Sequence, residues 1–414
     1  MNRQSFESIR KYFYPLKRSL FSGLLLCFPS LLQSQTNSDL QVSLLTVMPR
    51  SKAVYTIYGH TALRLYDPVR PVDMVLNWGT FDSDKPNFIY HFLLGETDYF
   101  LSATSARHFI SAYKAGNSTV VEQVLNIPDS LKTSLLQMLD TCLQPENVEY
   151  RYNIFFDNCT TRPRDIIEKI CGGTLIYPKQ NEPVTIRKSV HGCTEHYPWM
   201  EFGIDLLIGN GADSLISRRT EMFLPERLMN LLNRSFVKTT GGTEYPVVLS
   251  EKTVLQSEDD SHAKNISPLT KPVAVSAFVF LVYLILTIIP YRSPFTLHPS
   301  PNYPFACLFL LAGLGGCIIA GLVFLSKHPC TSPNWNIVWL HPLHLIGFAG
   351  FLVRKLYPLF RWYHTVNFVL LSGFLLGWHW IPQELNAAFI PLAGSLWLVS
   401  GYQVLRKKNV KNKK

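Results

Sequence analysis

Apolar and polar positions divide the chain into a mixed front part and a strongly apolar last third. From Pro272 onward the sequence carries long apolar segments separated by short polar pieces, at 273–289, 305–325, 337–353, 365–381 and 388–405. Each segment approaches the ~20 residues that an α-helix needs to cross the hydrocarbon core of a bilayer. The pattern therefore predicts a transmembrane domain of five helices over residues 272–405, followed by a basic tail at 406–414.

The first 35 residues contain a different kind of apolar segment. Basic residues precede an apolar run from Leu20 to Leu32, which Pro29 interrupts and which is short for a membrane-spanning helix. This arrangement is typical of a secretory signal peptide, so we expect residues 1–35 to direct export. An uncleaved membrane anchor is the alternative.

The stretch between these segments is predicted to be one exported domain. Residues 36–250 are long enough to fold around their own core, and the polar residues 251–271 are predicted to be a linker into the membrane. Basic residues follow the third apolar segment and the fifth one. The positive-inside rule assigns those sides to the cytoplasm and the domain at 36–250 to the outer side of the membrane.

The charge of the chain is concentrated at its two ends. The first 18 residues carry +4 and the tail from Arg406 carries +6, which together account for the formal net charge of +10. The remainder is balanced. The basic character therefore follows from membrane topology and does not indicate nucleic-acid binding.

One cysteine of the exported domain lies in an unusual context. Cys159 occurs in the stretch NIFFDNCTTRPRD, after the helix-capping residues Asp157 and Asn158 and before the helical pattern RDIIEKI. Pro163 fits the first turn of such a helix. Because free N–H groups at a helix N-terminus favour a thiolate, Cys159 is a candidate nucleophile. A buried structural cysteine is the alternative.

The exported domain contains three other cysteines. If Cys159 remains a thiol, one pair can form among Cys142, Cys171 and Cys193. We expect that pair to be Cys171 and Cys193.

A candidate base lies upstream, in the stretch YTIYGHTALRLYDP. His60 begins an alternating run that predicts a strand, and the next strand-like run, DMVLNWGTF, follows a DPVRPVD turn. If the two strands pair as a hairpin, Asn77 or Asp73 lies beside His60 and holds its far ring nitrogen, as in a Cys-His-Asn triad. A lone structural histidine is the alternative.

Several ordered motifs between about residues 40 and 235 resemble one known family. They are YGHTALRLYD, NWGTFDSDKPNFIYHFLLGETDYFLS, YRYNIFFDNCTTRPRDII and DLLIGNGADSLISRRTEMFLPERLM. Together they look like the exported domain of the Lnb-type lipoprotein N-acyltransferases of Bacteroidetes, in which a multipass membrane segment follows. The resemblance implies an α+β fold, with a permuted papain-like (NlpC-type) exported domain before a five-helix transmembrane bundle. His60 and Cys159 match the family's histidine on an early strand and its cysteine at a later helix N-terminus.

The resemblance also implies a reaction at the outer face of the bacterial inner membrane. Cys159 takes an acyl chain from a phospholipid as a thioester, and the α-amino group of a lipoprotein's diacylglyceryl-cysteine then takes the chain as an amide. His60 is the base and Asn77 the third residue, with Asp73 as the second choice. Backbone N–H groups at the helix start and Tyr58 are candidate donors to the oxyanion. The reaction requires no metal or cofactor.

Substrate-binding candidates lie beside the nucleophile and in the membrane segments. Arg162 either contacts a lipid phosphate or pairs with a nearby carboxylate. His341 and His344, three apart, are expected on one face of the third membrane helix, and His379 near the outer end of the fourth. These histidines either meet a head group or are interfacial residues beside tryptophans. The run WNIVWLHPLHLIGF is the favoured lipid-facing element.

Two other functions fit part of this pattern. An NlpC-type cell-wall peptidase or a phospholipase uses the same kind of cysteine and histidine, although a hydrolase needs at most one membrane anchor. A non-enzymatic membrane sensor uses the exported domain as a binding module and leaves Cys159 dispensable. The five apolar segments favour the acyltransferase, because both of its substrates lie in a bilayer.

Overall fold

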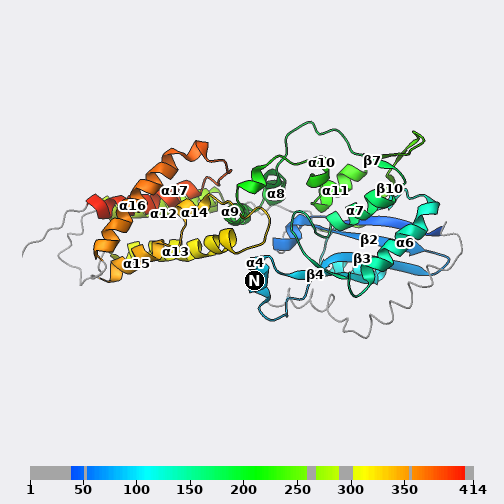
Figure 1. The fold of residues 1–414 in the computed structure, drawn as a ribbon, viewed down its shortest axis with the longest axis horizontal. Coiled ribbons are helices and arrows are strands. Elements are labelled where there is room, and N and C mark those ends of the chain that lie inside the picture. Colours follow the sequence, from blue (N-terminus) through cyan, green and yellow to red (C-terminus); the bar gives the residue numbers. More distant parts are fainter. Residues whose placement is uncertain (1–38, 51–53, 259–266, 289–301, 354–356, 406–414) are drawn as a thin grey trace, which may run out of the picture. The chain divides into compact units, whose positions relative to one another are not determined.

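The computed structural model describes residues 39–405 apart from 51–53, 259–266, 289–301 and 354–356 (Figure 1). The expected signal peptide at 1–35 and basic tail at 406–414 lie outside the described residues. The chain divides into two compact units, each with its own apolar core. A sheet unit comprises Met1–Cys193 and Leu215–His262, and a helical unit comprises Thr194–Ser214 and Ala263–Lys414.

A seven-stranded antiparallel sheet is the framework of the sheet unit. Its strand order is β10-β5-β1-β2-β3-β4-β6, and a small second sheet has the order β7-β8-β9. The strands of the large sheet are β1 (Gln41–Val47), β2 (His60–Asp67), β3 (Val72–Thr80), β4 (Asp98–Ser105), β5 (Val120–Leu125), β6 (Glu149–Arg151) and β10 (Val248–Leu255). Those of the small sheet are β7 (Thr174–Ile176), β8 (Phe236–Lys238) and β9 (Glu244–Pro246).

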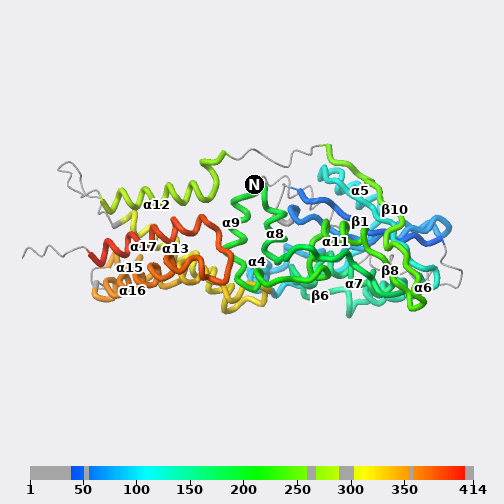
Figure 2. Tube along the Cα trace, turned by 90° about the horizontal axis from the view of Figure 1, so that it is seen from above, coloured from blue at the N-terminus to red at the C-terminus, as the bar shows by residue number. Residues whose placement is uncertain are grey.

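Helices cover both faces of the large sheet. Figure 2 shows α5 on one side of the sheet and α6, α7 and α11 on the other. The α-helices of this unit are α4 (Phe88–Leu94), α5 (Ala106–Ala115), α6 (Asp129–Leu143), α7 (Thr161–Ile170), α8 (Ile186–Thr194), α10 (Arg218–Glu221) and α11 (Pro225–Leu232). A 3-10 helix, η2 (Val54–Tyr58), precedes β2.

Two apolar layers follow from the alternation of side chains along the strands. Leu44 and Leu63 belong to the layer beneath α6 and α7, whereas their neighbours Leu45 and Ala62 belong to the layer beneath α5. Both layers are buried, so the sheet is apolar on each face. This explains why six of the seven residues of β1 are buried, among them the polar Ser43 and Thr46.

The boundaries of the exported domain differ from the expected ones in two places. Glu251–Leu255 were expected in the linker, but they continue β10 and pair with β5 at one edge of the sheet. Residues 194–214 were expected in the exported domain, but they belong to the helical unit. Both differences depend on contacts between segments far apart in the sequence.

The helical unit contains the apolar segments of the last third. Its elements are α9 (Pro198–Leu207), η3 (Asn210–Asp213), η4 (Pro268–Thr270), α12 (Pro272–Ile288), α13 (Asn302–Phe324), α14 (Asn336–Trp339), α15 (His344–Leu352), α16 (Tyr357–Leu376), η6 (Trp378–Trp380) and α17 (Phe389–Leu405). The fourth segment, expected at 365–381, begins earlier and ends earlier as α16. The third segment is not one helix, because Pro342 lies between α14 and α15 and lacks the N–H that a continuous helix requires.

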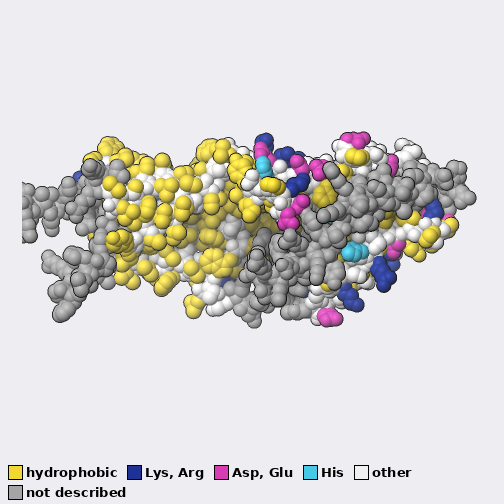
Figure 3. All heavy atoms as spheres, turned by 90° about the horizontal axis from the view of Figure 1, so that it is seen from below, with side chains coloured by type: hydrophobic (Ala, Val, Ile, Leu, Met, Phe, Trp, Pro, Cys, Tyr) yellow, Lys and Arg dark blue, Asp and Glu magenta, His cyan; other side chains and the backbone are white. Residues whose placement is uncertain are grey.

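Among the described residues, one helix is by itself long and apolar enough to cross a bilayer. It covers Tyr303–Phe324 with a mean hydropathy of 2.5, whereas Pro272–Ile288, Asn336–Leu352 and Phe389–Leu405 are apolar but shorter. Figure 3 shows apolar side chains gathered over the face of the helical unit. Large exposed apolar residues such as Leu311 and Val369 contribute to this surface.

Polar contacts attach residues 205–210 to the loops of the helical unit. The Asn336 amide donates to the Asp205 carbonyl at 2.8 Å, and the Asn334 amide donates to the Leu206 carbonyl at 2.9 Å. Gln383 donates to the Ile208 carbonyl at 3.2 Å. These buried amides satisfy carbonyls at the end of α9, which explains why this segment belongs to the helical unit.

Candidate active site

Cys159 lies two residues before the first residue of α7, in a turn that Asn158 holds. The Asn158 Oδ1 atom accepts hydrogen bonds from the backbone N–H groups of Thr160 at 2.8 Å and Thr161 at 2.9 Å. The Asn158 amide donates to two backbone carbonyls, one of them Phe223 beyond α10. Pro163 is the third residue of α7, inside the first turn as predicted. The cysteine is therefore held by a capped helix start.

His60 and Asn77 meet across the predicted hairpin. β2 and β3 pair in antiparallel register, so both side chains lie at the end of the sheet where β2 begins. The His60 Nε2 atom donates to Asn77 Oδ1 at 3.3 Å, which leaves Nδ1 as the ring nitrogen available to the Cys159 thiol. The imidazole also stacks on Tyr113 of α5, with 6.4 Å between ring centroids. Two neighbours thus set the orientation of the ring.

A bulge in β3 brings Cys159 close to this hairpin. The pairing of β3 with β4 shifts between Asn77 and Thr80, and Gly79 within the bulge has a φ of +88°. A β-carbon on Gly79 would lie 3.4 Å from Cβ of Cys159 and 3.3 Å from a ring carbon of Tyr152. Glycine is required here both by the left-handed φ and by the space that the two side chains occupy.

The electrostatics of Cys159 and His60 match those of an activated thiol. Burial raises the pKa of Cys159. The charge of His60 and hydrogen bonds from His60, Thr160 and the Thr61 N–H lower it by a larger amount, so the net shift of the pKa is downward. Burial lowers the pKa of His60, but the charge and hydrogen bond of Cys159 and the hydrogen bond of Asn77 raise it above the ordinary value. The pair favours thiolate and imidazolium.

Tyr152 is a site residue that the sequence analysis missed. Its hydroxyl forms a hydrogen bond with Cys159, and burial followed by the charge of Cys159 raises its pKa well above the ordinary value. The ring stacks on Tyr99 of β4, with 4.2 Å between centroids. The one available signal was its place in YRYNIFFDNC, seven residues before the cysteine in a motif already singled out.

Asp73 does not lie beside His60, so the second choice for the third residue is wrong. The hairpin register pairs Asp73 with Tyr66, near the turn end of β2. At ~3.4 Å per residue, six residues separate His60 from Tyr66 by roughly 20 Å. The Asp73 carboxylate pairs with Arg64 at 2.7 Å.

Tyr58 is not placed at the nucleophile either. Burial and then the charge of Cys193 raise its pKa, and Cys159 is not among the groups that act on it. Tyr58 is the last residue of η2, and Gly59, which has a φ of +76°, turns the chain between it and the start of β2. Although Tyr58 is close to His60 in the sequence, its hydroxyl is therefore not brought to the Cys159 thiol.

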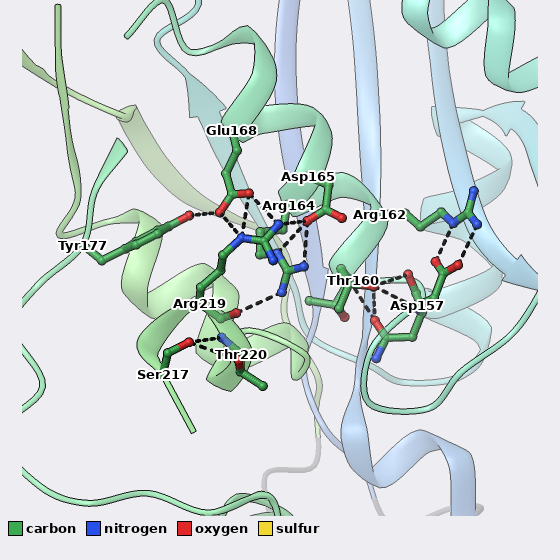
Figure 4. A network of polar contacts seen from close by, with 12 residues as sticks. Asp157, Thr160, Arg162, Arg164, Asp165, Glu168, Tyr177, Ser217, Arg219 and Thr220 are labelled. Carbon is green, nitrogen blue, oxygen red and sulfur yellow. Dashed lines mark hydrogen bonds and ion pairs between the residues drawn. The ribbon is translucent and has the colours of Figure 1, made fainter. Parts of the chain in front are cut away.

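Arg162 forms a bidentate ion pair with a nearby carboxylate, which was one of its two expected interactions. Its Nε and Nη2 atoms donate to the Asp157 carboxylate at 2.6 and 2.7 Å, and its guanidinium lies 3.8 Å from the Tyr150 ring centroid. Figure 4 shows this pair, and on the other side of α7 a second network around Arg219. There Arg219 pairs with Asp165 at 2.6 Å and Glu168 at 2.8 Å, which fixes α10 to α7.

The expected disulfide is absent. Cys142, Cys171 and Cys193 are free thiols, and the Cys171 thiol donates to the Glu168 and Gly173 carbonyls at 3.3 Å. Burial is the main cause that raises the pKa of each of these three thiols. Among the cysteines of the sheet unit within the described residues, Cys159 alone has a lowered pKa.

The membrane-segment histidines are brought together, but not on a helix face. The rings of His341 and His344 stack with 3.9 Å between centroids, and His341 lies in the break before α15. His344 is fully buried, and both of its ring nitrogens are engaged, with the Tyr363 hydroxyl at 2.5 Å and the Trp339 carbonyl at 2.9 Å. The expectation that this run faces lipid is wrong for His344. His379 is exposed in η6, directly after α16.

A cavity of about 360 Å³ lies elsewhere in the sheet unit. Lys179, Arg218, Arg227 and Arg234 are among its lining residues, and Cys159 and His60 are not. This basic pocket lies beside α10 and α11 and does not include the surroundings of the nucleophile.

Comparison with known families agrees with this two-part organisation. The Lnb N-terminal periplasmic domain matches residues 28–192, and the Lnb transmembrane domain matches residues 263–410. No curated protein and no solved structure matches the chain significantly. The two matched domains describe a membrane protein with a periplasmic part, and they account for most of the chain. The chain therefore belongs to the Lnb-type lipoprotein N-acyltransferases.

Proposed function

We propose that Cys159 carries an acyl group, as a thioester, from a phospholipid to the α-amino group of a lipoprotein's diacylglyceryl-cysteine. The observation that carries this proposal is the contact of Cys159 with His60, which Asn77 orients at 3.3 Å. The order of histidine strand before cysteine helix supports a permuted papain-like arrangement. Papain-like proteases use a Cys-His-Asn set for acyl transfer through a thioester.

The first half-reaction transfers the acyl group to the enzyme. The Cys159 thiolate attacks the ester carbonyl of the phospholipid and forms a C–S bond. The tetrahedral oxyanion then collapses, the C–O bond to the glycerol oxygen breaks, and the His60 imidazolium protonates that oxygen. A lysophospholipid leaves, and His60 remains neutral beside the thioester.

Two groups near Cys159 are suited to hold the oxyanion. The N–H groups of Thr160 and Thr161 are occupied by Asn158, so the expected role of the helix N–H groups does not extend to them. The N–H of Cys159 has no partner among the described residues, and the Tyr152 hydroxyl is already at the sulfur. We assign the oxyanion to these two donors in place of Tyr58.

The second half-reaction transfers the acyl group to the lipoprotein. The neutral α-amino group attacks the thioester carbonyl, and His60 accepts a proton from the nitrogen as the amide forms. The C–S bond breaks and restores the thiolate beside the imidazolium. A thioester suits this task because it is reactive toward an amine and reacts slowly with water.

The membrane context of the proposal follows from both substrates. The phospholipid and the diacylglyceryl group are held in a bilayer, so the helical unit is assigned to the inner membrane as a multipass anchor with five crossings. The sheet unit is assigned to the periplasmic side. Arg162 and the exposed His379 remain candidates for head-group contact, although Asp157 already engages two nitrogens of Arg162.

The test is detection of the thioester on the full-length protein in detergent. Protein given phosphatidylethanolamine alone is expected to gain the mass of one acyl group, and hydroxylamine is expected to remove it. The adduct should be absent in Cys159→Ala, while the matched Cys142→Ala variant should form it at the wild-type rate. A diacylglyceryl-cysteine peptide with a free amine should discharge the adduct to an amide, and an N-blocked peptide should not.

Other outcomes identify the rival functions. Discharge by water as fast as by the amine indicates a phospholipase. Cleavage of cell-wall peptides without a lipid adduct indicates a peptidase. Wild-type N-acylation of lipoproteins in cells that carry only Cys159→Ala removes the nucleophile from the mechanism and favours a non-enzymatic role.

A further inference from the structure

A continuous row of aromatic rings leads from the nucleophile to the protein surface. Tyr152 stacks on Tyr99 at 4.2 Å between centroids, and Tyr99 contacts Phe81 at 5.2 Å. Phe81 stacks on Phe88 at 5.5 Å, and Phe88 stacks on Phe92 at 6.2 Å. We call these five residues the aromatic row. It begins at the hydroxyl that contacts Cys159 and ends on α4.

The far end of the row is unusually apolar and open. The sequence of α4 is FIYHFLL, yet none of its residues is buried. Ile89 is 74% exposed and Leu93 is 44% exposed. Tyr99 is 7% exposed, whereas Phe81 is 36% and Phe92 is 38% exposed, so the part of the row toward α4 is open to solvent. An exposed apolar helix of this kind is costly in water and marks a site where apolar material binds.

We infer that the aromatic row, together with the exposed face of α4, binds the hydrocarbon chain of the acyl donor. This inference rests on the proposed function, because the chain that it guides is the one that Cys159 receives. The row is continuous with the nucleophile, so a chain whose carbonyl lies at the sulfur extends along it. Each of its five members presents an aromatic ring, and none carries a formal charge. The open end at α4 lets the chain enter from a lipid surface.

The energetic consequence is a dependence on chain length. Each methylene that leaves water for an apolar surface contributes roughly a fourfold change in binding. Donors with longer chains should therefore acylate Cys159 faster at limiting concentration, until the chain outgrows the row. Removal of one ring should reduce this gain only for chains long enough to reach that ring.

The experiment measures thioester formation on the full-length protein in detergent, with phosphatidylethanolamines whose chains lengthen by two carbons at a time from butyryl to palmitoyl. Phe81→Ser and Phe92→Ser remove rings near to and far from the nucleophile. The butyryl donor should react at the wild-type rate in both variants. For longer chains, Phe81→Ser should form the thioester about tenfold more slowly than the wild type. This loss of rate should begin at a shorter chain length in Phe81→Ser than in Phe92→Ser.

A matched control uses an equally large apolar residue outside the row. Phe236 in β8 is 50% exposed and is not one of the five rings. Phe236→Ser should keep the wild-type dependence on chain length. Circular dichroism should be the same for all three variants, which shows that each folds, whereas each should unfold at a somewhat lower temperature because it loses the buried part of a ring.

Several results overturn the inference. If the rate of thioester formation depends on acyl-chain length in the same way in the wild type and in both variants, the aromatic row does not contact the acyl chain. An equal loss for all donors, butyryl included, means that the row only supports Tyr152. A changed oligomeric state with an unchanged chain-length dependence means that α4 is a protein interface. If the wild type forms no thioester with any donor, the proposed function itself fails.

Discussion

The Nε2 atom of His60 lies 3.3 Å from the Oδ1 atom of Asn77, across the hairpin of β2 and β3. Because an amide oxygen can only accept, this contact requires a proton on Nε2 and leaves Nδ1 as the atom that takes the proton of the Cys159 thiol. Asn77 is itself buried, so its side chain is held in place by the sheet. One residue pair thus fixes both the tautomer and the direction of the base.

Asn77→Ala should slow acylation of Cys159 by roughly 10- to 100-fold, part of the ~10²–10⁴-fold that a positioned base contributes. The imidazole remains but loses its orientation, so kcat should fall while KM changes little. Single-turnover thioester formation measures the effect. Asp73→Ala, in the same strand but paired with Arg64, should retain the wild-type rate. An equal loss in both variants contradicts the assigned role of Asn77.

The rate of acylation should have a bell-shaped pH dependence that belongs to the Cys159–His60 pair as a unit. It falls as the pH drops through the lowered pKa of Cys159, because the thiolate gains a proton. It falls again as the pH rises through the raised pKa of His60, because the imidazolium that protonates the leaving oxygen is lost. Asn77→Ala removes one cause of the raised pKa, so its alkaline limb should move to lower pH. An unmoved alkaline limb argues against that hydrogen bond.

Iodoacetamide should label Cys159 before the other cysteines of the sheet unit at neutral pH. Burial raises the pKa of Cys142 and Cys171, and it raises the pKa of Cys193 to about 11. Since thiolate reacts and each unit of pKa changes its fraction tenfold, we expect a rate at least ~10-fold higher at Cys159. Peptide mass spectrometry of briefly labelled protein gives the order. Equal labelling would mean that Cys159 is not activated.

Gly79→Ala should damage both stability and activity. The φ of +88° is unfavourable for alanine, and its methyl group meets Cys159 and Tyr152 at 3.4 and 3.3 Å. We expect a loss of about 1–2 kcal/mol in the free energy of unfolding and a more than tenfold slower acylation. Gly192→Ala in α8, where a β-carbon has nothing within 4 Å, is the control: it should keep the wild-type acylation rate and should not lower the free energy of unfolding, because alanine favours a helix more than glycine does.

Tyr152→Phe should reduce the rate of acylation by roughly 10²–10³-fold, the loss typical of one oxyanion donor. The ring and its stacking on Tyr99 remain, so the thermal unfolding temperature should change little. Tyr66→Phe, at the other end of β2, loses a hydroxyl without affecting the site and should keep full activity. A near-normal rate in Tyr152→Phe leaves the Cys159 N–H as the principal donor.

The sequence by itself determined the elements that carry the site. The alternation of apolar and polar residues after His60 and the turn before Asp73 predicted the hairpin. The capping residues before Pro163 predicted a helix that begins just after Cys159. These patterns are local: a strand, a turn or a capped helix start depends on interactions within about ten residues. The ordered motifs likewise sufficed to indicate the family.

Tertiary structure decided which residues meet at the sulfur. The choice of Asn77 over Asp73 depends on the hairpin register, and Tyr152 reaches Cys159 because a bulge with Gly79 leaves space for both. β10 joined the sheet by pairing with β5, more than a hundred residues away. Such contacts are set by the packing of whole layers, whose free energy is summed over many distant residues. A single stretch of sequence specifies the conformation of its own backbone, but its neighbours in space depend on that sum.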